Sequence, residues 1–235
     1  GVTILNGAKN NKVIGNYIGT DLTGKIAVPN ILYGVWLNSD SNFVGGGQAG
    51  EGNVISGNGG TPRSPDTPPQ GDGVYVSAGT GNTIQANYIG TQMDGVTALP
   101  NERNGVNVEG GTGTVVGVGN VISANKQYGV EVSAPGTQIR QALIGKDKTG
   151  TKLLPNVKGN IKVQPGATGT KISSNNIGGS QGPSVDVTGA AGVQVADNTI
   201  DSCDGDAVKL DGTSLAQVTG NTITGNGGHG VYVLN

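Results

Sequence analysis

The chain has 235 residues, of which 45 are glycine, whereas charged residues make up 13% and aromatic residues only 3%. Glycine at this level without a three-residue period excludes collagen and argues against an ordinary helical domain. The net charge of -2, with no basic stripe, gives no support to binding of nucleic acid or of an anionic membrane surface. No apolar run is long enough to span a membrane, and a single cysteine excludes an intrachain disulfide.

A repeat with three parts runs along the chain. The first part is a small residue, a β-branched residue, any residue and an aliphatic residue, found as GVTI at 1, GVWL at 34, GVYV at 73, GVNV at 105, GVEV at 129, NIKV at 160, SVDV at 184, AVKL at 207 and GVYV at 230. The second part is found as NTIQ at 82, TVVG at 114, TQIR at 137, TKIS at 170 and VQVA at 193. The third part begins with asparagine, as NYIG at 16, NVIS at 53, NYIG at 87, NVIS at 120, NNIG at 175, NTID at 198 and NTIT at 221, and only ALIG at 142 lacks the asparagine. Each part has the pattern of a short strand.

Three short strands that recur every 23 to 39 residues cannot bury a face alone, but stacked coils enclose a continuous core. The sequence therefore predicts an all-β solenoid, a single-stranded parallel β-helix of about eight coils with three short strands each, on the order of 40 Å long. Alternation within the strands places Val74 and Val76 inside and Tyr75 outside. The recurring asparagine predicts a ladder of side-chain amides that bond to the coils above and below.

Three longer connections, IGTDLTGKIAVPN at 18, IGTQMDGVTALPN at 89 and IGKDKTGTKLLPN at 144, are expected to protrude on one side from alternate coils. They align Asp21, Gln92 and Asp147. Alternate coils would hold these loops about 10 Å apart, and Ca²⁺ needs more oxygen ligands than the three residues supply, so no shared metal site is expected. A Pro-rich insertion at 59–72 enlarges one further coil.

The strings GNVISGN, GNTIQANYIGT and IGTDLTGKIAVPN resemble the right-handed parallel β-helix repeat of large bacterial surface and secreted proteins, and the resemblance covers essentially the whole chain. It implies a right-handed helix and an extracellular or cell-surface location, although no signal peptide is recognised in the sequence. It does not imply one activity, because this scaffold serves lyases, hydrolases, adhesins and phage tailspikes. We expect one domain over 1–235, either a segment of a longer protein or an uncapped unit that associates end to end.

The outward residues of the first strand would lie above one another in the stack, in the order Trp36, Tyr75, Asn107, Glu131, Lys162, Asp186, Lys209 and Tyr232. The two aromatic residues Trp36 and Tyr75 would form a platform for a sugar ring. Asn107 and Glu131 would continue this surface with polar groups, so these four residues are the predicted glycan-binding site. The alternative is that the column serves only cross-strand pairing, because its later members alternate in charge.

A second candidate site lies near the end of the sequence. The segments Gly228-His229-Gly230 and Gly205-Asp206-Ala207, one coil of 23 residues apart, are similar to the GHG and GDD elements of the GH28 polygalacturonases, which share this fold. The NTD and Arg-x-Lys elements of that family are absent, and hydrolysis with inversion needs both an acid and a base carboxylate. Gly230, directly after His229, also occupies the same position of the coil repeat as Gly34 and Gly73. An enzyme at this end would use Asp204, Asp206, Lys209 and His229 as catalytic residues.

Other patterns leave alternatives open. The acid run Asp201, Asp204, Asp206 and Asp211 would hold Ca²⁺ or act in acid–base catalysis, or consist of solvated turn residues. No acids surround the arginines in the sequence, at Arg63, Arg103 and Arg140. Ice binding would need flat Thr-x-Thr rows, whereas this chain has one threonine per coil, at Thr83, Thr114, Thr137 and Thr170.

The sequence thus predicts an extracellular or cell-surface structural rod that presents loops or binds a polysaccharide or cell-surface glycan, without a cofactor and without nucleic acid as a partner. The alternative is a polysaccharide lyase or glycoside hydrolase that acts on an acidic polysaccharide and uses Ca²⁺.

Overall fold

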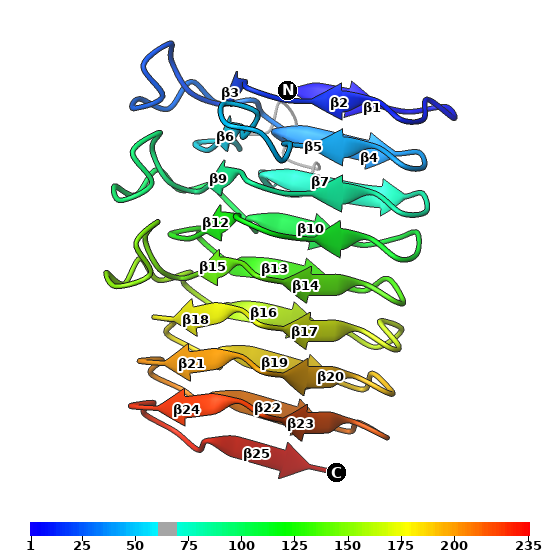
Figure 1. Cartoon of the computed structure of the whole chain (residues 1–235), viewed down its shortest axis with the longest axis vertical. Helices are drawn as coiled ribbons and strands as arrows, with labels where there is room; N and C mark the ends of the chain where they lie inside the picture. Colours follow the sequence, from blue (N-terminus) through cyan, green and yellow to red (C-terminus); the bar gives the residue numbers. More distant parts are fainter. Residues whose placement is uncertain (61–69) are drawn as a thin grey trace.

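The structure, a computed structural model, describes residues 1–60 and 70–235. These residues form a rod of stacked coils, with the N-terminus at one end and the C-terminus at the other (Figure 1). They contain strands and no helix, so no apolar helix of membrane-spanning length occurs among them. Arg63 and most of the Pro-rich insertion lie outside the described residues.

Each coil contributes one strand to each of three parallel sheets that run the length of the rod. The first sheet has nine strands, in the order β1 (Val2–Ile4), β4 (Val35–Asn38), β7 (Val74–Ala78), β10 (Val106–Val108), β13 (Tyr128–Val132), β16 (Gly159–Val163), β19 (Val185–Thr188), β22 (Val208–Asp211) and β25 (Val231–Leu234). The second sheet has eight, β2 (Lys12–Val13), β5 (Phe43–Val44), β8 (Thr83–Ile84), β11 (Val115–Val116), β14 (Gln138–Arg140), β17 (Lys171–Ser173), β20 (Gln194–Ala196) and β23 (Gln217–Thr219). The third sheet also has eight, β3 (Tyr17–Ile18), β6 (Val54–Ile55), β9 (Tyr88–Ile89), β12 (Val121–Ile122), β15 (Leu143–Ile144), β18 (Asn176–Gly178), β21 (Thr199–Asp201) and β24 (Thr222–Thr224). The predicted parallel β-helix with three short strands per coil is confirmed.

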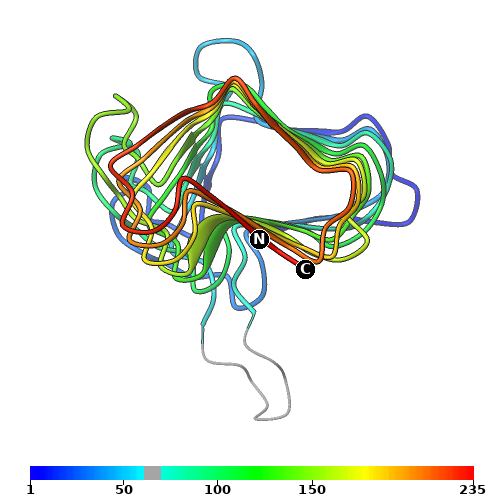
Figure 2. The same ribbon diagram turned by 90° about the horizontal axis from the view of Figure 1, so that it is seen from below.

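The core is a set of aliphatic columns inside the three sheets. Val74 and Val76 of β7 are fully buried and Tyr75 between them is not, as the alternating pattern predicts. In the third sheet Ile89 and Ile122 lie in register and are also fully buried. Figure 2 shows that successive coils follow a similar path around the axis. The buried aliphatic side chains form one continuous cluster along the rod. Burying one such side chain contributes about 1.5–3 kcal/mol.

Two ladders of asparagine side chains line the turns. The predicted ladder joins neighbouring amides at 2.8 to 3.1 Å and is interrupted only at Ala142; its members are Asn16, Asn53, Asn87 and Asn120, then Asn175, Asn198 and Asn221. A second ladder, which sequence reasoning missed, joins amides at 2.9 to 3.0 Å and consists of Asn30, Asn58, Asn101, Asn125, Asn156 and Asn160. Both ladders satisfy backbone groups that the sharp turns would otherwise leave unpaired.

The corner before the first ladder needs a left-handed residue. Ala86 and Ser174, which precede ladder asparagines, have φ values of 57° and 56°. Glycine occupies the same position at Gly15 and Gly119, where this conformation carries no steric cost. A side chain there costs about 1–2 kcal/mol, so the ladder must hold the corner in shape.

The three long connections lie on the same side of the rod, as expected (Figure 1), and an antiparallel bridge closes each of them. Neighbouring loops also contact each other, which the sequence did not predict. The amide of Met93 donates to the carbonyl of Gly24 at 3.1 Å, and the amide of Lys148 donates to that of Gly95 at 2.9 Å. The loops therefore form a small extra layer outside the third sheet.

Aspartates brace these loops. Asp21 and Asp147 each accept backbone amides from residues four and five positions later, at 3.0 to 3.2 Å. In the middle loop the carboxylate is supplied by Asp94 rather than at the aligned position Gln92. The amide of Ile26 lowers the pKa of Asp21; burial acts to raise the pKa of Asp94 and Asp147, but their hydrogen bonds outweigh it and lower the pKa. These carboxylates stabilise turns, which explains their alignment without a metal.

Candidate functional site

The outward residues of the first sheet form one column. The strand register pairs Trp36 with Tyr75, and Tyr75 with Asn107. From Asn107 the column continues in register through Glu131, Lys162, Asp186, Lys209 and Tyr232. The predicted stacking of these positions is confirmed. The side chains around the column determine the chemical character of each part of it.

Three aromatic rings gather at the N-terminal part of this column. Tyr33 stacks on Tyr75 with 4.4 Å between the ring centroids and 22° between the ring planes. Trp36 is tilted against both tyrosines, with centroid separations of 5.9 and 6.3 Å. Its Nε1 donates to the hydroxyl of Ser77 at 2.7 Å, which fixes the indole. The predicted platform of Trp36 and Tyr75 is thus part of a cluster of three rings.

An open groove with a volume of about 460 Å³ begins at this aromatic cluster and extends to Glu131. Its lining is mostly polar and consists of Tyr33, Gln70, Tyr75, Arg103, Asn107, Glu109, Glu131 and Ser133. The volume falls within the range of about 300–1,000 Å³ that is common for ligand sites. Three of the four predicted glycan-binding residues line this groove, and Trp36 supports it from the side.

A buried carboxylate lies behind the groove. Asp72 is 0% exposed, and its carboxylate accepts the amide of Asn104 at 3.0 Å and the side-chain amide of Asn107 at 3.3 Å. Nη1 of Arg103 lies 3.6 Å from Oδ2 of Asp72, so this arginine has an acidic partner that its sequence neighbours do not provide. Burial raises the pKa of Asp72, although Arg103 acts in the opposite direction. Asn107, predicted to project outward, is only 7% exposed because its amide turns toward Asp72.

Neutral donors hold the two remaining acidic side chains of the groove. Glu131 accepts the side-chain amide of Asn104 and that of Gln164, both at 2.8 Å. Glu109 accepts the hydroxyl of Tyr75. Burial, and then the contact with Glu109, raises the pKa of Tyr75, so this hydroxyl remains a donor at neutral pH.

Sequence reasoning missed six residues of this site: Tyr33, Gln70, Asp72, Arg103, Glu109 and Ser133. Tyr33 and Asp72 occupy the turn position just before the first strand of a coil, and Glu109 follows directly after β10. The prediction considered only outward positions within strands, where alternation fixes the direction of a side chain. The turn position itself is visible in the alignment of coils, and comparing its residues would have found Tyr33 and Asp72.

Replacing Asp72 with asparagine is expected to change the pH dependence of stability. Because the folded-state pKa of Asp72 lies above its unfolded value, the wild type gains stability as pH falls through this interval, and the variant lacks that gain. At neutral pH the D72N variant should be as stable as the wild type or more stable, by on the order of 1 kcal/mol per unit of pKa shift. Urea unfolding between neutral and mildly acidic pH measures how the free energy of unfolding of each protein depends on pH. If the wild type becomes more stable relative to D72N as pH rises, the pKa of Asp72 is not raised in the folded state.

The second candidate site is present only in part. Nδ1 of His229 lies 2.9 Å from Oδ1 of Asp206, which also accepts the His229 backbone amide at 2.7 Å. The imidazole stacks on Tyr232 with 4.7 Å between centroids. Burial acts to raise the pKa of Asp206, but the hydrogen bonds from His229 and the charge of Lys209 outweigh it and lower the pKa. The other two predicted catalytic residues do not join this pair: Lys209 lies 3.3 Å from a different acid, and Asp204 is exposed in a turn.

The position of Asp206 also has a structural explanation. Its carboxylate accepts the backbone amide of the equivalent turn residue in the next coil. Asp72 does the same for Asn104, and Asn104 does the same for Tyr128, each at 3.0 Å. The apparent GDD-like aspartate therefore performs a turn-bracing role that recurs along the rod.

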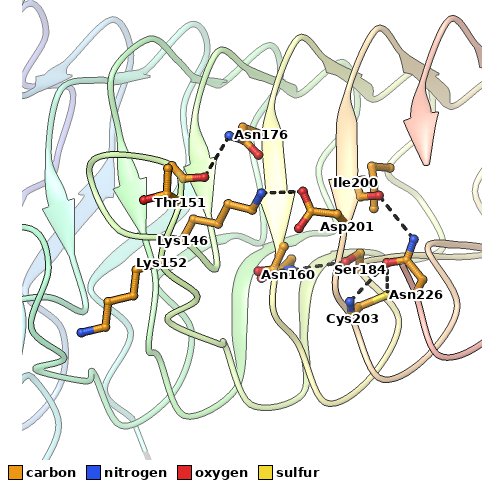
Figure 3. A network of polar contacts seen from close by, with 12 residues as sticks. Lys146, Thr151, Lys152, Asn160, Asn176, Ser184, Ile200, Asp201, Cys203 and Asn226 are labelled. Atoms are coloured by element: carbon orange, nitrogen blue, oxygen red, sulfur yellow. Dashed lines mark hydrogen bonds and ion pairs between the residues drawn. The ribbon is translucent and has the colours of Figure 1, made fainter. Parts of the chain in front are cut away.

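Three acids of the run Asp201, Asp204, Asp206 and Asp211 have separate partners, and Asp204 is exposed. Asp201 pairs with Lys146 at 2.6 Å, across the coil that lies between them (Figure 3). Asp206 contacts the imidazole, and Asp211 pairs with Lys209. Within 1–60 and 70–235, no three side chains of His, Cys, Asp or Glu gather around a common point that would suit a metal ion.

Comparison with known proteins places this architecture in a family. The family described as right handed beta helix region matches residues 33–235. The chain belongs to this right-handed β-helix family. No curated protein matches the sequence.

Three solved structures resemble this β-helix. The Dettilon tailspike protein has a TM-score of 0.55 at 15% identity, with 98% of this chain and 61% of the tailspike covered. The A-module of the Azotobacter vinelandii mannuronan C-5 epimerase AlgE6 has a TM-score of 0.33 at 14% identity, covering 100% of this chain and 82% of the module. Tailspike protein 2 of the Escherichia coli O157:H7 bacteriophage CAB120 has a TM-score of 0.35 at 11% identity, covering 92% and 35%. The chain thus spans about three fifths of the length of the Dettilon tailspike, and at this identity the likeness concerns the fold alone.

The threonine column of this β-helix does not form an ice-binding face. Thr114, Thr137 and Thr170 are fully buried, and the hydroxyls of Thr137 and Thr170 donate to carbonyls of their own turns. Thr83 is out of step with the other three, because its register partner is Val115 rather than Thr114. The four threonines therefore do not form one outward-facing column.

Proposed function

We propose that this chain is an extracellular or cell-surface β-helical rod that binds a polysaccharide in the groove between the aromatic cluster and Glu131. The observation that carries the proposal is the stacked Tyr33–Tyr75 pair at the border of a groove lined with polar side chains. Aromatic rings offer apolar faces to the C–H side of a sugar, and amides, carboxylates and a guanidinium supply partners for its hydroxyls. That rods also associate end to end stays a prediction.

The groove is prepared for binding before a ligand arrives. Its side chains project from the strands of a stacked scaffold and from the turns next to them, and most of them have fixed hydrogen-bond partners. Glu131 is held by Asn104 and Gln164, and Tyr33 donates to Gln70 at 2.7 Å. Such preorganisation reduces the entropy lost on binding. Successive coils present new side chains at about 4.8 Å intervals, which suits an extended chain that lies parallel to the rod axis.

Replacing Tyr75 with alanine is expected to weaken oligosaccharide binding at least about tenfold, or about 1.4 kcal/mol. The change removes one stacking ring and leaves Glu109 without its donor. Binding is measured by calorimetry against a panel of neutral, amino-sugar and uronic-acid oligosaccharides. Trp36 provides a second signal, because it is the only tryptophan and its ring lies 6.3 Å from that of Tyr75.

The matched control is Tyr17→Ala, which removes an exposed tyrosine from the third sheet. This variant should bind like the wild type. If no member of the panel binds the wild type, or if Y75A and Y17A bind equally well, the proposal is wrong.

The second candidate function is cleavage of a polysaccharide at Asp206 and His229, and the 2.9 Å contact between them favours it. A histidine oriented by a carboxylate is a common arrangement for general base catalysis. Incubation of the protein with the same oligosaccharide panel, with and without Ca²⁺, tests this function. The assay measures new reducing ends, which hydrolysis produces, and unsaturated chain ends, which elimination produces. Turnover that is lost in Asp206→Asn would establish it, because asparagine keeps the turn-bracing acceptor, as Asn104 shows.

A further inference from the structure

The groove contains two acidic side chains that no cation neutralises among the described residues. Arg103, the only described cation in the lining, is paired with Asp72. Glu109 and Glu131 take part in no ion pair within 4 Å in the described part of the chain. Among the described residues, the groove lining therefore has a net negative charge that no ion pair compensates.

The remainder of the column differs from the groove in this respect. Lys162 lies 2.8 Å from Asp186, and the hydroxyl of Thr188 also accepts a hydrogen bond from the same ammonium group. Lys209 is paired with Asp211. Each lysine of this part of the column thus pairs with an acid of its own coil or of the next coil. The two glutamates without an ion pair lie in the aromatic groove.

The contacts of the two glutamates indicate that their charges serve the groove rather than the fold. Their partners are neutral amides and a hydroxyl, which hold the carboxylates in place without cancelling their charge. Like charges gathered in a concave surface focus a negative potential there. This potential attracts a cationic group and repels a carboxylated sugar.

We infer that the groove selects sugars that carry a protonated amino group over N-acetylated and uronic-acid sugars. This inference rests on the proposed function, since it specifies which glycan the groove binds. An ammonium group beside the Tyr33–Tyr75 rings would also gain from cation–π attraction. The predicted ligand is therefore a cationic glycan. The enzymatic alternative predicted from the sequence would act on an acidic polysaccharide instead.

The test uses three oligosaccharides of equal length: a fully deacetylated β-1,4-glucosamine oligomer, its N-acetylated counterpart and an oligogalacturonate. At about 0.1 M salt, where the Debye length is about 10 Å, the deacetylated oligomer should bind at least about tenfold more tightly than the acetylated one. The oligogalacturonate should bind more weakly than both. Raising the salt concentration should reduce the ratio between the deacetylated and acetylated oligomers.

In the double variant Glu109→Gln with Glu131→Gln, this ratio should fall to about one, because the shape of the groove is kept and its charge is removed. The control is the double variant Asp40→Asn with Asp211→Asn, which changes the net charge equally, at surface pairs with Lys9 and Lys209 outside the groove. This control should keep the wild-type ratio. A tenfold change in the ratio corresponds to about 1.4 kcal/mol, well within calorimetric resolution.

The outcomes separate this inference from the proposed function. If the acetylated oligomer binds as tightly as the deacetylated one, or if the double variant keeps the preference, the inference is overturned and glycan binding stands. If none of the three oligomers binds, and none of the neutral panel does, the proposed function itself is overturned.

Discussion

Replacing Asn87 with alanine is expected to lower the free energy of unfolding by about 3 kcal/mol, because it removes a central rung of the first ladder. Oδ1 of Asn87 accepts the backbone amide and the side-chain amide of Asn53, and Nδ2 donates to the carbonyls of Val44 and Gln85 and to Asn120. Alanine would leave the two donors of Asn53 buried without acceptors, and each such group costs about 1–3 kcal/mol. Urea unfolding followed by circular dichroism measures the loss.

The matched control is Asn16→Ala, at the exposed end of the same ladder. Asn16 donates to Asn53 but serves as acceptor for no asparagine of a preceding coil, so the N16A variant should lose less than about 1 kcal/mol. Stacked coils can unfold in parts, and hydrogen exchange should therefore show that the Asn53 amide loses protection selectively in N87A. Equal losses in the two variants would show that burial of the ladder is not the source of its stabilisation.

The fold was predictable because its determinants recur locally in every coil. Val74, Tyr75 and Val76 carry the inside–outside alternation within three consecutive residues, and the equivalent residues of later coils repeat it. Asn87 and Asn120 precede the same kind of strand in each coil, so their alignment follows from the repeat. Register then needed no information about distant contacts, since a slip would turn the core residues outward.

The second ladder and the loop layer were not predictable by the same means. Asn58 follows its strand β6 closely, whereas Asn101 comes after the long loop that follows β9. Equivalent rungs therefore lie at different distances from the strands, and no fixed spacing identifies them. The loop contacts, such as that between Met93 and Gly24, depend on how the loops bend, which strand spacing does not determine.

The candidate groove was predictable only where side chains lie on strands. Tyr75 and Glu131 occupy outward strand positions and were found. Tyr33 and Asp72 lie in turns, where no alternation fixes the direction of a side chain. Arg103 meets Asp72 only because the stack brings their coils together, and their local sequences contain no sign of the pair.

Replacing Asp201 with alanine is expected to lower the free energy of unfolding by about 2–3 kcal/mol, because it leaves a buried cation unpaired. The side chain of Lys146 is 6% exposed, and that of Asp201 is 23% exposed, so water partly reaches the carboxylate but scarcely reaches the ammonium group. Lys146 extends from the coil of β15 past Gly178 to the coil of β21. Figure 3 shows its contact with Asp201. A Cβ at Gly178 would overlap Cε of Lys146, so glycine in the middle coil makes this long-range pair feasible.

Two further variants separate the cost of the orphaned charge from the value of the pair. Adding Lys146→Met to D201A removes the unpaired cation, and this double variant should recover most of the loss, since apolar replacements of buried ion pairs are often neutral. Asp211→Ala breaks the more exposed pair with Lys209 and should cost no more than about 1 kcal/mol, because solvent screens surface ion pairs. Equal losses in D201A and D211A, or no recovery in the double variant, would mean that the buried lysine does not need its partner. A larger loss in D201A than in D211A would instead show that one ion pair spanning three coils helps to stabilise this part of the rod.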